Sequence, residues 1–172
     1  MGPTARPAVP AICAATKDRI VYVRRGAVIA LGIITPAGPE AVEALMGALI
    51  DPDAVVVDNA AHGLMGIGNL AVPPLTKALA SPDNGLRQMA VLALSGGIRF
   101  GRFRDVGPDT VSALITTLAD PDVDTRDEAA RALADLGPSA RSALPALERM
   151  AASDPEGTAR MSARRAIERI GQ

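Results

Sequence analysis

A short pattern that recurs along the chain constrains its fold more than any other feature. The clearest copy runs from Asp120 to Gly137 and reads DPDVDTRDEAARALADLG. Counted from its first Asp, an Arg stands six residues on, an Ala nine on, Leu thirteen and sixteen on, and the Gly seventeen on. Further copies in the same register begin at Asp18, Asp51, Ser81 and Asp154. Self-similarity at a fixed spacing predicts a repeat architecture, in which each unit buries its apolar face against its neighbours.

The segment before each copy repeats as well. It reads GPEAVEALMGALI from Gly38, GNLAVPPLTKALA from Gly68 and GPDTVSALITTLA from Gly107. In the first of these, Val42, Leu45 and Leu49 are three and four residues apart, which places them on one face of a helix. Pro39, Pro108 and Pro138 each follow a Gly, and such a Gly-Pro pair ends one helix and begins the next. Each unit is therefore predicted to be a pair of helices of about 30 residues.

These units resemble HEAT repeats, and in particular the short HEAT-like repeats of phycobilisome lyases. The resemblance covers residues 5–171 and rests on the Asp in the turn, the Arg six residues later, the Ala-Ala step and the final Leu-x-x-Leu/Ile-Gly. It implies an all-α fold, an α-solenoid of five antiparallel helix pairs with about ten helices, in one domain over residues 1–172. We expect the repeats to span residues 5–35, 38–67, 68–98, 107–136 and 137–171, with an insertion at 99–106.

The resemblance also implies a ladder of charge-assisted bonds between neighbouring repeats, formed by the recurring Asp and Arg. Its members would be Asp18, Arg24, Asp51, Arg87, Asp120, Arg126, Asp154 and Arg160. The chain departs from the pattern at two positions, because Val57 replaces an Arg and Ser81 replaces an Asp. We therefore expect the ladder to be weaker around the second and third repeats.

The composition suits a solenoid and excludes several classes of function. The chain is 48% apolar but only 2% aromatic, so its core must consist mainly of Ala, Leu, Val and Ile. A net charge of −1 gives no global field that would attract nucleic acid or an anionic membrane. The single His and the single Cys predict neither a metal site nor a nucleophile pair, and no cofactor is expected. Without a secretory signal or a membrane-spanning apolar run, a cytoplasmic location is expected.

The second helix of each pair is the candidate for a binding surface, since the resemblance places it on the concave side. Its outward positions are mostly polar or charged in the fourth and fifth repeats, with Met161 among them, but include more large apolar residues in the first three. Such an apolar surface with a few polar groups predicts a site for a protein partner or a hydrophobic small molecule, or a homodimer surface. The candidate residues are Tyr22, Arg25, Ile29, Asp58, Asn59, His62, Gln88, Met89 and Leu92.

The insertion at 99–106 holds both phenylalanines of the chain, Phe100 and Phe103, beside Arg102. Aromatic and Arg side chains anchor interfaces and stack on bases, so these three residues are candidates for partner contacts at the rim of the concave surface. The alternative is that the Phe residues pack into the junction of two repeats while the Arg faces water. Nucleic acid binding is the less favoured function, because its groove should be basic and aromatic.

Two functions remain open at this point. The first is a HEAT-like binding module that holds a protein partner or an apolar ligand on the concave face of repeats one to three. The second is a lyase-, isomerase- or cyclase-type enzyme in which Asp58 and His62, four residues apart on one helix face, act as the acid/base pair with Tyr22. Asp58 and His62 could equally be a surface pair. Glycines within these helices cost about 1 kcal/mol each, which close approach of a ligand or a neighbouring helix would explain.

Overall fold

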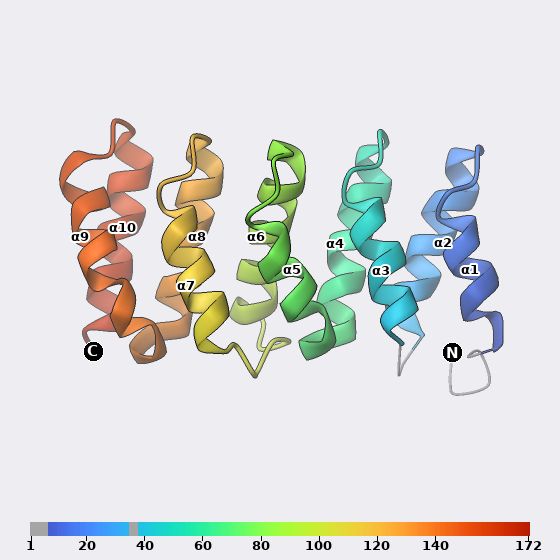
Figure 1. The fold of residues 1–172 in the computed structure, drawn as a ribbon, viewed down its shortest axis with the longest axis horizontal. Coiled ribbons are helices and arrows are strands. Elements are labelled where there is room, and N and C mark those ends of the chain that lie inside the picture. Colours follow the sequence, from blue (N-terminus) through green and yellow to red (C-terminus); the bar gives the residue numbers. More distant parts are fainter. Residues whose placement is uncertain (1–6, 35–37) are drawn as a thin grey trace.

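The computed structural model describes residues 7–34 and 38–172, and within them every regular element is a helix. Consecutive helices run in opposite directions and form hairpins that stand side by side in a row (Figure 1). The helices are α1 (Val9–Ala15), α2 (Val21–Ile33), α3 (Pro39–Ala48), α4 (Ala54–Ile67), η2 (Gly68–Ala71), α5 (Val72–Ala78), α6 (Asn84–Arg99), α7 (Pro108–Thr117), α8 (Val123–Leu136), η3 (Gly137–Ala143), α9 (Leu144–Ser153) and α10 (Gly157–Ile170). The predicted all-helical solenoid is therefore confirmed.

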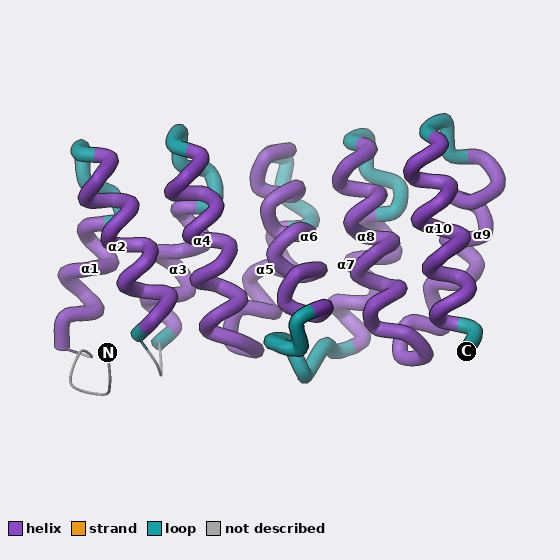
Figure 2. The backbone as a smooth tube through the Cα atoms, turned by 180° about the vertical axis from the view of Figure 1, so that it is seen from behind, coloured by secondary structure: helices purple, strands orange, loops and turns teal. Residues whose placement is uncertain are grey.

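The helices form two layers, with the odd-numbered α-helices in front in Figure 1 and the even-numbered ones in front in the reverse view of Figure 2. The even-numbered layer is continuous, because α2 packs on α4, α4 on α6, α6 on α8 and α8 on α10. In the odd-numbered layer α1 packs on α3 and α5 on α7, whereas α3 and α5, like α7 and α9, make few or no direct contacts and are connected through η2 and η3. Side chains on the solvent side of the continuous layer thus lie on neighbouring helices.

The starts of α4, α6 and α8 are fixed by the Asp that follows Pro in each Asp-Pro-Asp or Ser-Pro-Asp turn. Asp53, Asp83 and Asp122 are the N-caps of α4, α6 and α8, and each carboxylate accepts a hydrogen bond from a backbone N–H three residues later. Such a bond satisfies an amide that has no partner within the helix. Gly68 and Gly137 follow the last residues of α4 and α8 with φ of 80° and 56°, a conformation that favours glycine.

The core between the layers consists of the aliphatic columns that repeat in the sequence. Leu45, Leu75 and Leu114 from the odd-numbered helices are completely buried. So are the Ala and Leu at positions nine and thirteen of the repeat, for example Ala60 and Leu64. Small Ala side chains at these positions allow the helices to approach closely, so that a chain with few aromatic residues still fills its interior.

The glycines of α2, α4 and α6 are explained largely by close helix contacts. A Cβ atom placed on Gly32 would lie 2.8 Å from the Cα atom of Gly63 on the neighbouring helix, and one on Gly66 would lie 3.0 Å from the Gly32 carbonyl oxygen. A Cβ atom on Gly96 would lie 2.8 Å from the Met65 sulfur. Neighbouring helices, rather than a ligand, therefore account for these residues.

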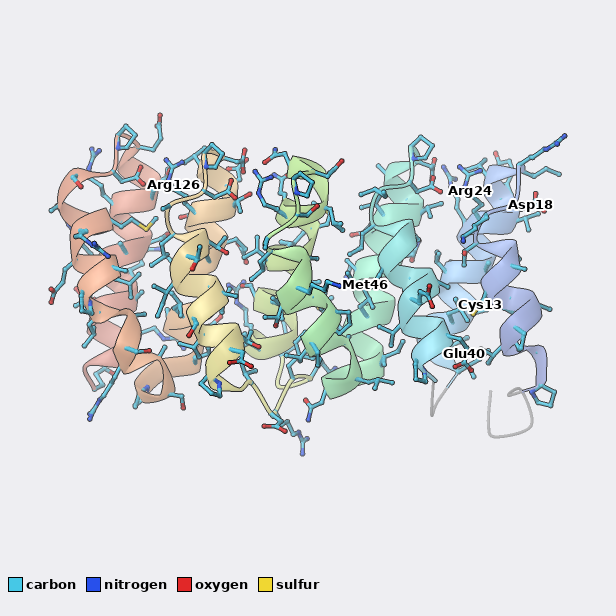
Figure 3. The ribbon with its side chains drawn as sticks, in the orientation of Figure 1. Cys13, Asp18, Arg24, Glu40, Met46 and Arg126 are labelled. Atoms are coloured by element: carbon cyan, nitrogen blue, oxygen red, sulfur yellow. The ribbon has the colours of Figure 1, made fainter. Side chains whose placement is uncertain are left out.

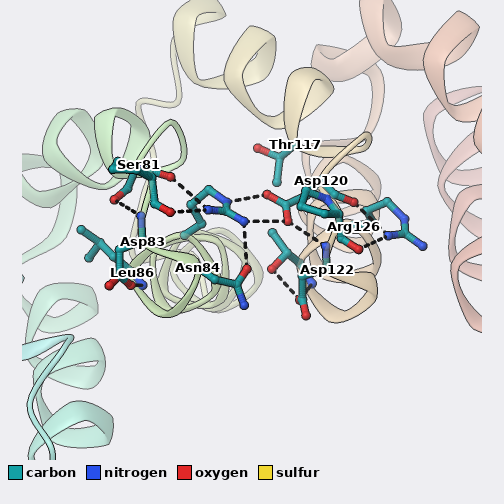
Figure 4. A network of polar contacts seen from close by, with 12 residues as sticks. Ser81, Asp83, Asn84, Leu86, Thr117, Asp120, Asp122 and Arg126 are labelled. Carbon is teal, nitrogen blue, oxygen red and sulfur yellow. Dashed lines mark hydrogen bonds and ion pairs between the residues drawn. The ribbon is translucent and has the colours of Figure 1, made fainter.

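The predicted ladder is present at three junctions. Arg24 pairs with Asp51, Arg87 with Asp120 and Arg126 with Asp154, each through two hydrogen bonds between the guanidinium and the carboxylate. The same arginines also donate to main-chain carbonyls of their own turn, as the network around Asp120 and Arg126 shows (Figure 4). Each pair links one hairpin to the next, and we call it a rung.

The rung is missing between α4 and α6, where Val57 and Ser81 stand in place of the Arg and the Asp. The two departures fall on the two sides of the same junction, so one complete rung is lost and no charge is left without its partner. At the ends of the row, the Asp18 carboxylate accepts from the Ile20 N–H and Arg160 donates to carbonyls of its own turn.

Candidate functional site

The solvent side of α2, α4 and α6 exposes several large apolar side chains, and we call this surface the even-helix face. Its exposed apolar residues are Tyr22 (75% exposed), Ile29 (47%) and Ile33 (54%) on α2, Val55 (44%) on α4 and Leu92 (45%) on α6. A helix at the surface of a globular protein normally presents polar residues on its outer side. Apolar side chains gathered on three successive helices are typical of an interaction site.

The corresponding side of α8 and α10 is different, because its charged side chains form ion pairs. Arg131 pairs with Asp127 and Glu128 on α8. Asp135 accepts from both Arg99 and Arg169, at 3.0 Å and 2.6 Å, and so links three consecutive even-numbered helices. Within the even-numbered layer the exposed large apolar residues thus lie mainly on α2, α4 and α6, as the sequence predicts, and Met161 is the one on α10.

Asp58 and His62 lie together on the outside of α4 but in an open environment. The imidazole Nδ1 lies 2.8 Å from the Asp58 carbonyl oxygen and 3.5 Å from its carboxylate, and the two side chains are 65% and 71% exposed. An acid/base pair usually depends on burial or on neighbouring charges that tune its pKa values. Tyr22 forms no hydrogen bond with either of them, and its ring lies beneath the guanidinium of Arg25, whose central carbon is 5.5 Å from the ring centroid.

Arg25 was predicted as a ligand-binding residue, but it joins two helices. Its Nε and Nη2 atoms donate to the Asp53 carboxylate at 2.9 Å and 2.7 Å. Because Asp53 is the N-cap of α4, this pair connects α2 to the start of α4 beside the rung formed by Arg24. The guanidinium lowers the pKa of Asp53 to about 2. Both groups are engaged within the protein, so Arg25 has a structural role.

Phe103 was also predicted as a contact residue, but its side chain is only 4% exposed. The ring packs against Gly97 and leaves no room for a side chain there, and the Gly97 carbonyl accepts from the N–H groups of Arg102 and Phe103. Phe100, by contrast, is 69% exposed. The two phenylalanines thus divide between the interpretations of the insertion: one packs into the junction and the other faces solvent.

A hollow of about 680 Å³ opens beside Phe100 and brings part of the predicted set together. Its lining includes His62 from α4 and Phe100 and Arg102 from the segment after α6. Sequence reasoning missed Met65 and Arg104, which also line it. Arg104 could have been found from its place in the same Phe/Arg insertion. Within the described residues neither Arg102 nor Arg104 forms an ion pair, so this hollow suits an anionic group.

The remaining predicted residues are less available. Asn59 donates to the Val55 carbonyl of its own helix at 2.7 Å, and Gln88 and Met89 are half-buried. Cys13 donates its thiol hydrogen to the Glu40 carbonyl oxygen (Figure 3), and burial raises the pKa of the thiol, as expected of an unreactive cysteine. Among residues 7–34 and 38–172 no group of His, Cys, Asp and Glu could hold a metal ion. None of the described helices is long and apolar enough to cross a membrane.

A row of helical hairpins, arranged in two layers and linked by Arg–Asp rungs, defines a helical-repeat protein of the α-solenoid class. The family model of HEAT repeats matches residues 72–168, and the model of the PBS lyase HEAT-like repeat matches residues 23–51. The chain therefore belongs to the HEAT repeat family.

Solved structures with the same fold include natural and designed solenoids. The complex of CpcE and CpcF of phycocyanin lyase from Nostoc sp. aligns with a TM-score of 0.62 and 24% identity, over 94% of this chain and 64% of that chain. A designed armadillo repeat protein in complex with the peptide (KR)4 aligns with a TM-score of 0.61 and 21% identity, over 97% and 83%. At these identities the likeness shows the fold alone. No curated protein sequence matches this chain.

Proposed function

We propose that this HEAT repeat protein is a binding module that holds a segment of a protein partner on the even-helix face. The observation that carries the proposal is the contrast between the two parts of the continuous layer. On α2, α4 and α6 large apolar side chains are exposed, whereas on α8 and α10 several charged residues already form ion pairs and Met161 is the one large apolar residue that is exposed. Burying exposed apolar area contributes roughly 25 cal/mol per Å², so a partner gains most on α2, α4 and α6.

The hollow beside Phe100 supports a further feature of that partner. Phe100, which is 69% exposed, Arg102 and Arg104 all line the hollow. An aromatic or aliphatic side chain of the partner would pack on the ring, and a neighbouring carboxylate would pair with the arginines. We therefore propose an apolar segment that carries an acidic residue.

The known proteins of this fold agree with a binding role. The designed armadillo repeat protein holds the peptide (KR)4, and CpcE and CpcF form a complex with each other. The exposure of Asp58 and His62 favours this role over the lyase-, isomerase- or cyclase-type enzyme, since neither group is desolvated.

Affinity capture with matched variants tests the proposal. Leu92→Asp places a charge on the even-helix face, and Met161→Asp places one on α10 at a side chain of similar exposure (45% and 53%). A protein retained by the wild type and by Met161→Asp, but lost with Leu92→Asp, would be purified and titrated. We expect Leu92→Asp to weaken its binding at least about tenfold, as the loss of a central apolar contact does. Equal binding by both variants, with unchanged circular dichroism, would contradict the proposal.

A further inference from the structure

An apolar groove lies in the odd-numbered layer, away from the even-helix face. It has a volume of about 720 Å³ and runs between α3 and α5. Pro39, Val42 and Met46 line it from α3, and Leu70 and Pro74 line it from η2 and α5. Figure 3 shows Met46 in the space between the two helices. Leu70 is 46% exposed, so the apolar wall is open to a partner.

The groove exists because two kinds of contact are missing at one junction. α3 and α5 do not pack against each other as α1 does on α3 and α5 on α7. The rung between α4 and α6 is also absent, and Ser81, which replaces its Asp, lines the groove. The hollow between α7 and α9 is smaller, about 460 Å³, and Arg126 and Asp154 of a rung line it. Of these two hollows in the odd-numbered layer, the α3–α5 groove is therefore the apolar one.

The shape of the groove matches a helix. α3 and α5 run in the same direction (Figure 1), and the α3 wall consists of residues spaced three and four apart, which form one continuous face. At the α1–α3 and α5–α7 junctions such a face is covered by the next odd-numbered helix, and at the α7–α9 junction η3 packs on both helices. A small-molecule pocket encloses most of its ligand. An open groove between two helices is instead the arrangement that accepts the apolar face of a third helix.

The charges at the groove specify that helix further. Glu43 lies on the α3 wall and Lys77 on the α5 wall, and within the described residues neither forms an ion pair. A helix that is basic on the flank toward α3 and acidic on the flank toward α5 would complement both. We propose that this groove binds an amphipathic α-helix of a partner protein, with an apolar stripe between a basic and an acidic flank. This site is independent of the even-helix face.

The test uses a capped, fluorescently labelled helical peptide of about four turns, with Leu at i, i+3, i+4 and i+7, Lys on one flank and Glu on the other. Fluorescence anisotropy would measure its binding to the full chain. We expect saturable binding that Leu70→Asp weakens at least tenfold, and that Met161→Asp and Leu92→Asp leave unchanged. Leu70 and these two control residues are similarly exposed, and circular dichroism would check that each variant is folded.

A second arm tests the charges. Glu43→Lys should weaken binding of the Lys/Glu peptide about threefold, and a peptide with Glu on both flanks should bind this variant better than it binds the wild type. Equal binding of a scrambled peptide, or no effect of Leu70→Asp, would overturn the proposal. So would concentration-dependent self-association that Leu70→Asp abolishes, which would make a second copy the occupant. A neutral naphthyl dye that binds in the groove and is not displaced by the peptide would show that the peptide binds elsewhere, and would also overturn the proposal.

Discussion

Removing one rung of the ladder by Arg126→Ala is the most direct perturbation of the contacts between hairpins. The Arg126 guanidinium donates to the two Asp154 carboxylate oxygens at 2.8 Å and 3.0 Å, and to the Asp120 carbonyl oxygen at 2.9 Å. The side chains of Arg126 and Asp154 are only 10% and 5% exposed. The variant therefore leaves a shielded carboxylate without its charged partner.

The expected cost lies between that of a surface ion pair, up to about 1 kcal/mol, and that of breaking a fully buried one, about 3–5 kcal/mol. Asp154 keeps one donor, the Glu156 N–H at 2.9 Å, which limits the loss. We expect the free energy of unfolding to fall by about 2 kcal/mol. For a chain of this size that lowers the melting temperature by about 4–8 °C.

Thermal unfolding followed by circular dichroism measures the loss, and hydrogen exchange locates it. In a solenoid each hairpin contacts only its neighbours, so amide protection should fall mainly in α9 and α10. Arg164→Ala, which removes an exposed Arg from α10, is the control. A double-mutant cycle with Asp154→Ala should give a coupling energy of at least about 1 kcal/mol. A destabilisation below about 0.5 kcal/mol, or one equal to that of the control, would refute the reasoning.

Three further predictions follow from other contacts. The double substitution Val57→Arg with Ser81→Asp should restore the missing rung, and calorimetry should show a melting temperature above that of either single variant. A change in melting temperature that only equals the sum of the two single-variant changes would contradict this. Gly97→Ala should cost about 1–3 kcal/mol in urea unfolding through overpacking against Phe103, and Phe103→Leu should recover part of it. The pKa of Asp53 is lowered from 3.8 to about 2, so its contribution to stability is complete above about pH 4 and is lost as the pH falls through 2. Asp53→Asn should flatten that acid-side slope.

Much of the fold could be predicted because the same physical requirement recurs in every unit. The register that begins at Asp120 identifies the buried Ala and Leu columns and the arginines of the ladder. It also identifies Val57 and Ser81 as the two departures, and the structure shows that they belong to one junction. A repeated pattern gives several independent observations of the same contact, which a single motif does not.

The site could be predicted only in part, because it depends on contacts that do not repeat. The exposure of Ile29 and Leu92 follows from their helix positions alone. The burial of Phe103 depends on how the loop after α6 folds back over Gly97, and the pairing of Arg25 depends on the cap of the next helix. The α3–α5 groove depends on the distance between two helices of ordinary sequence, which no local pattern encodes.

Hydroxyl-radical footprinting of the chain, alone and bound to its purified captured partner, tests the central claim most directly. Tyr22 and Leu92 report on the even-helix face, Phe100 on its hollow, and Met161 on the ion-paired side of α10; all four side chains are at least 45% exposed. The account predicts that the partner protects Tyr22, Leu92 and Phe100 from oxidation and leaves Met161 unchanged. Protection of Met161, with Tyr22 and Leu92 oxidised as in the free chain, would contradict it.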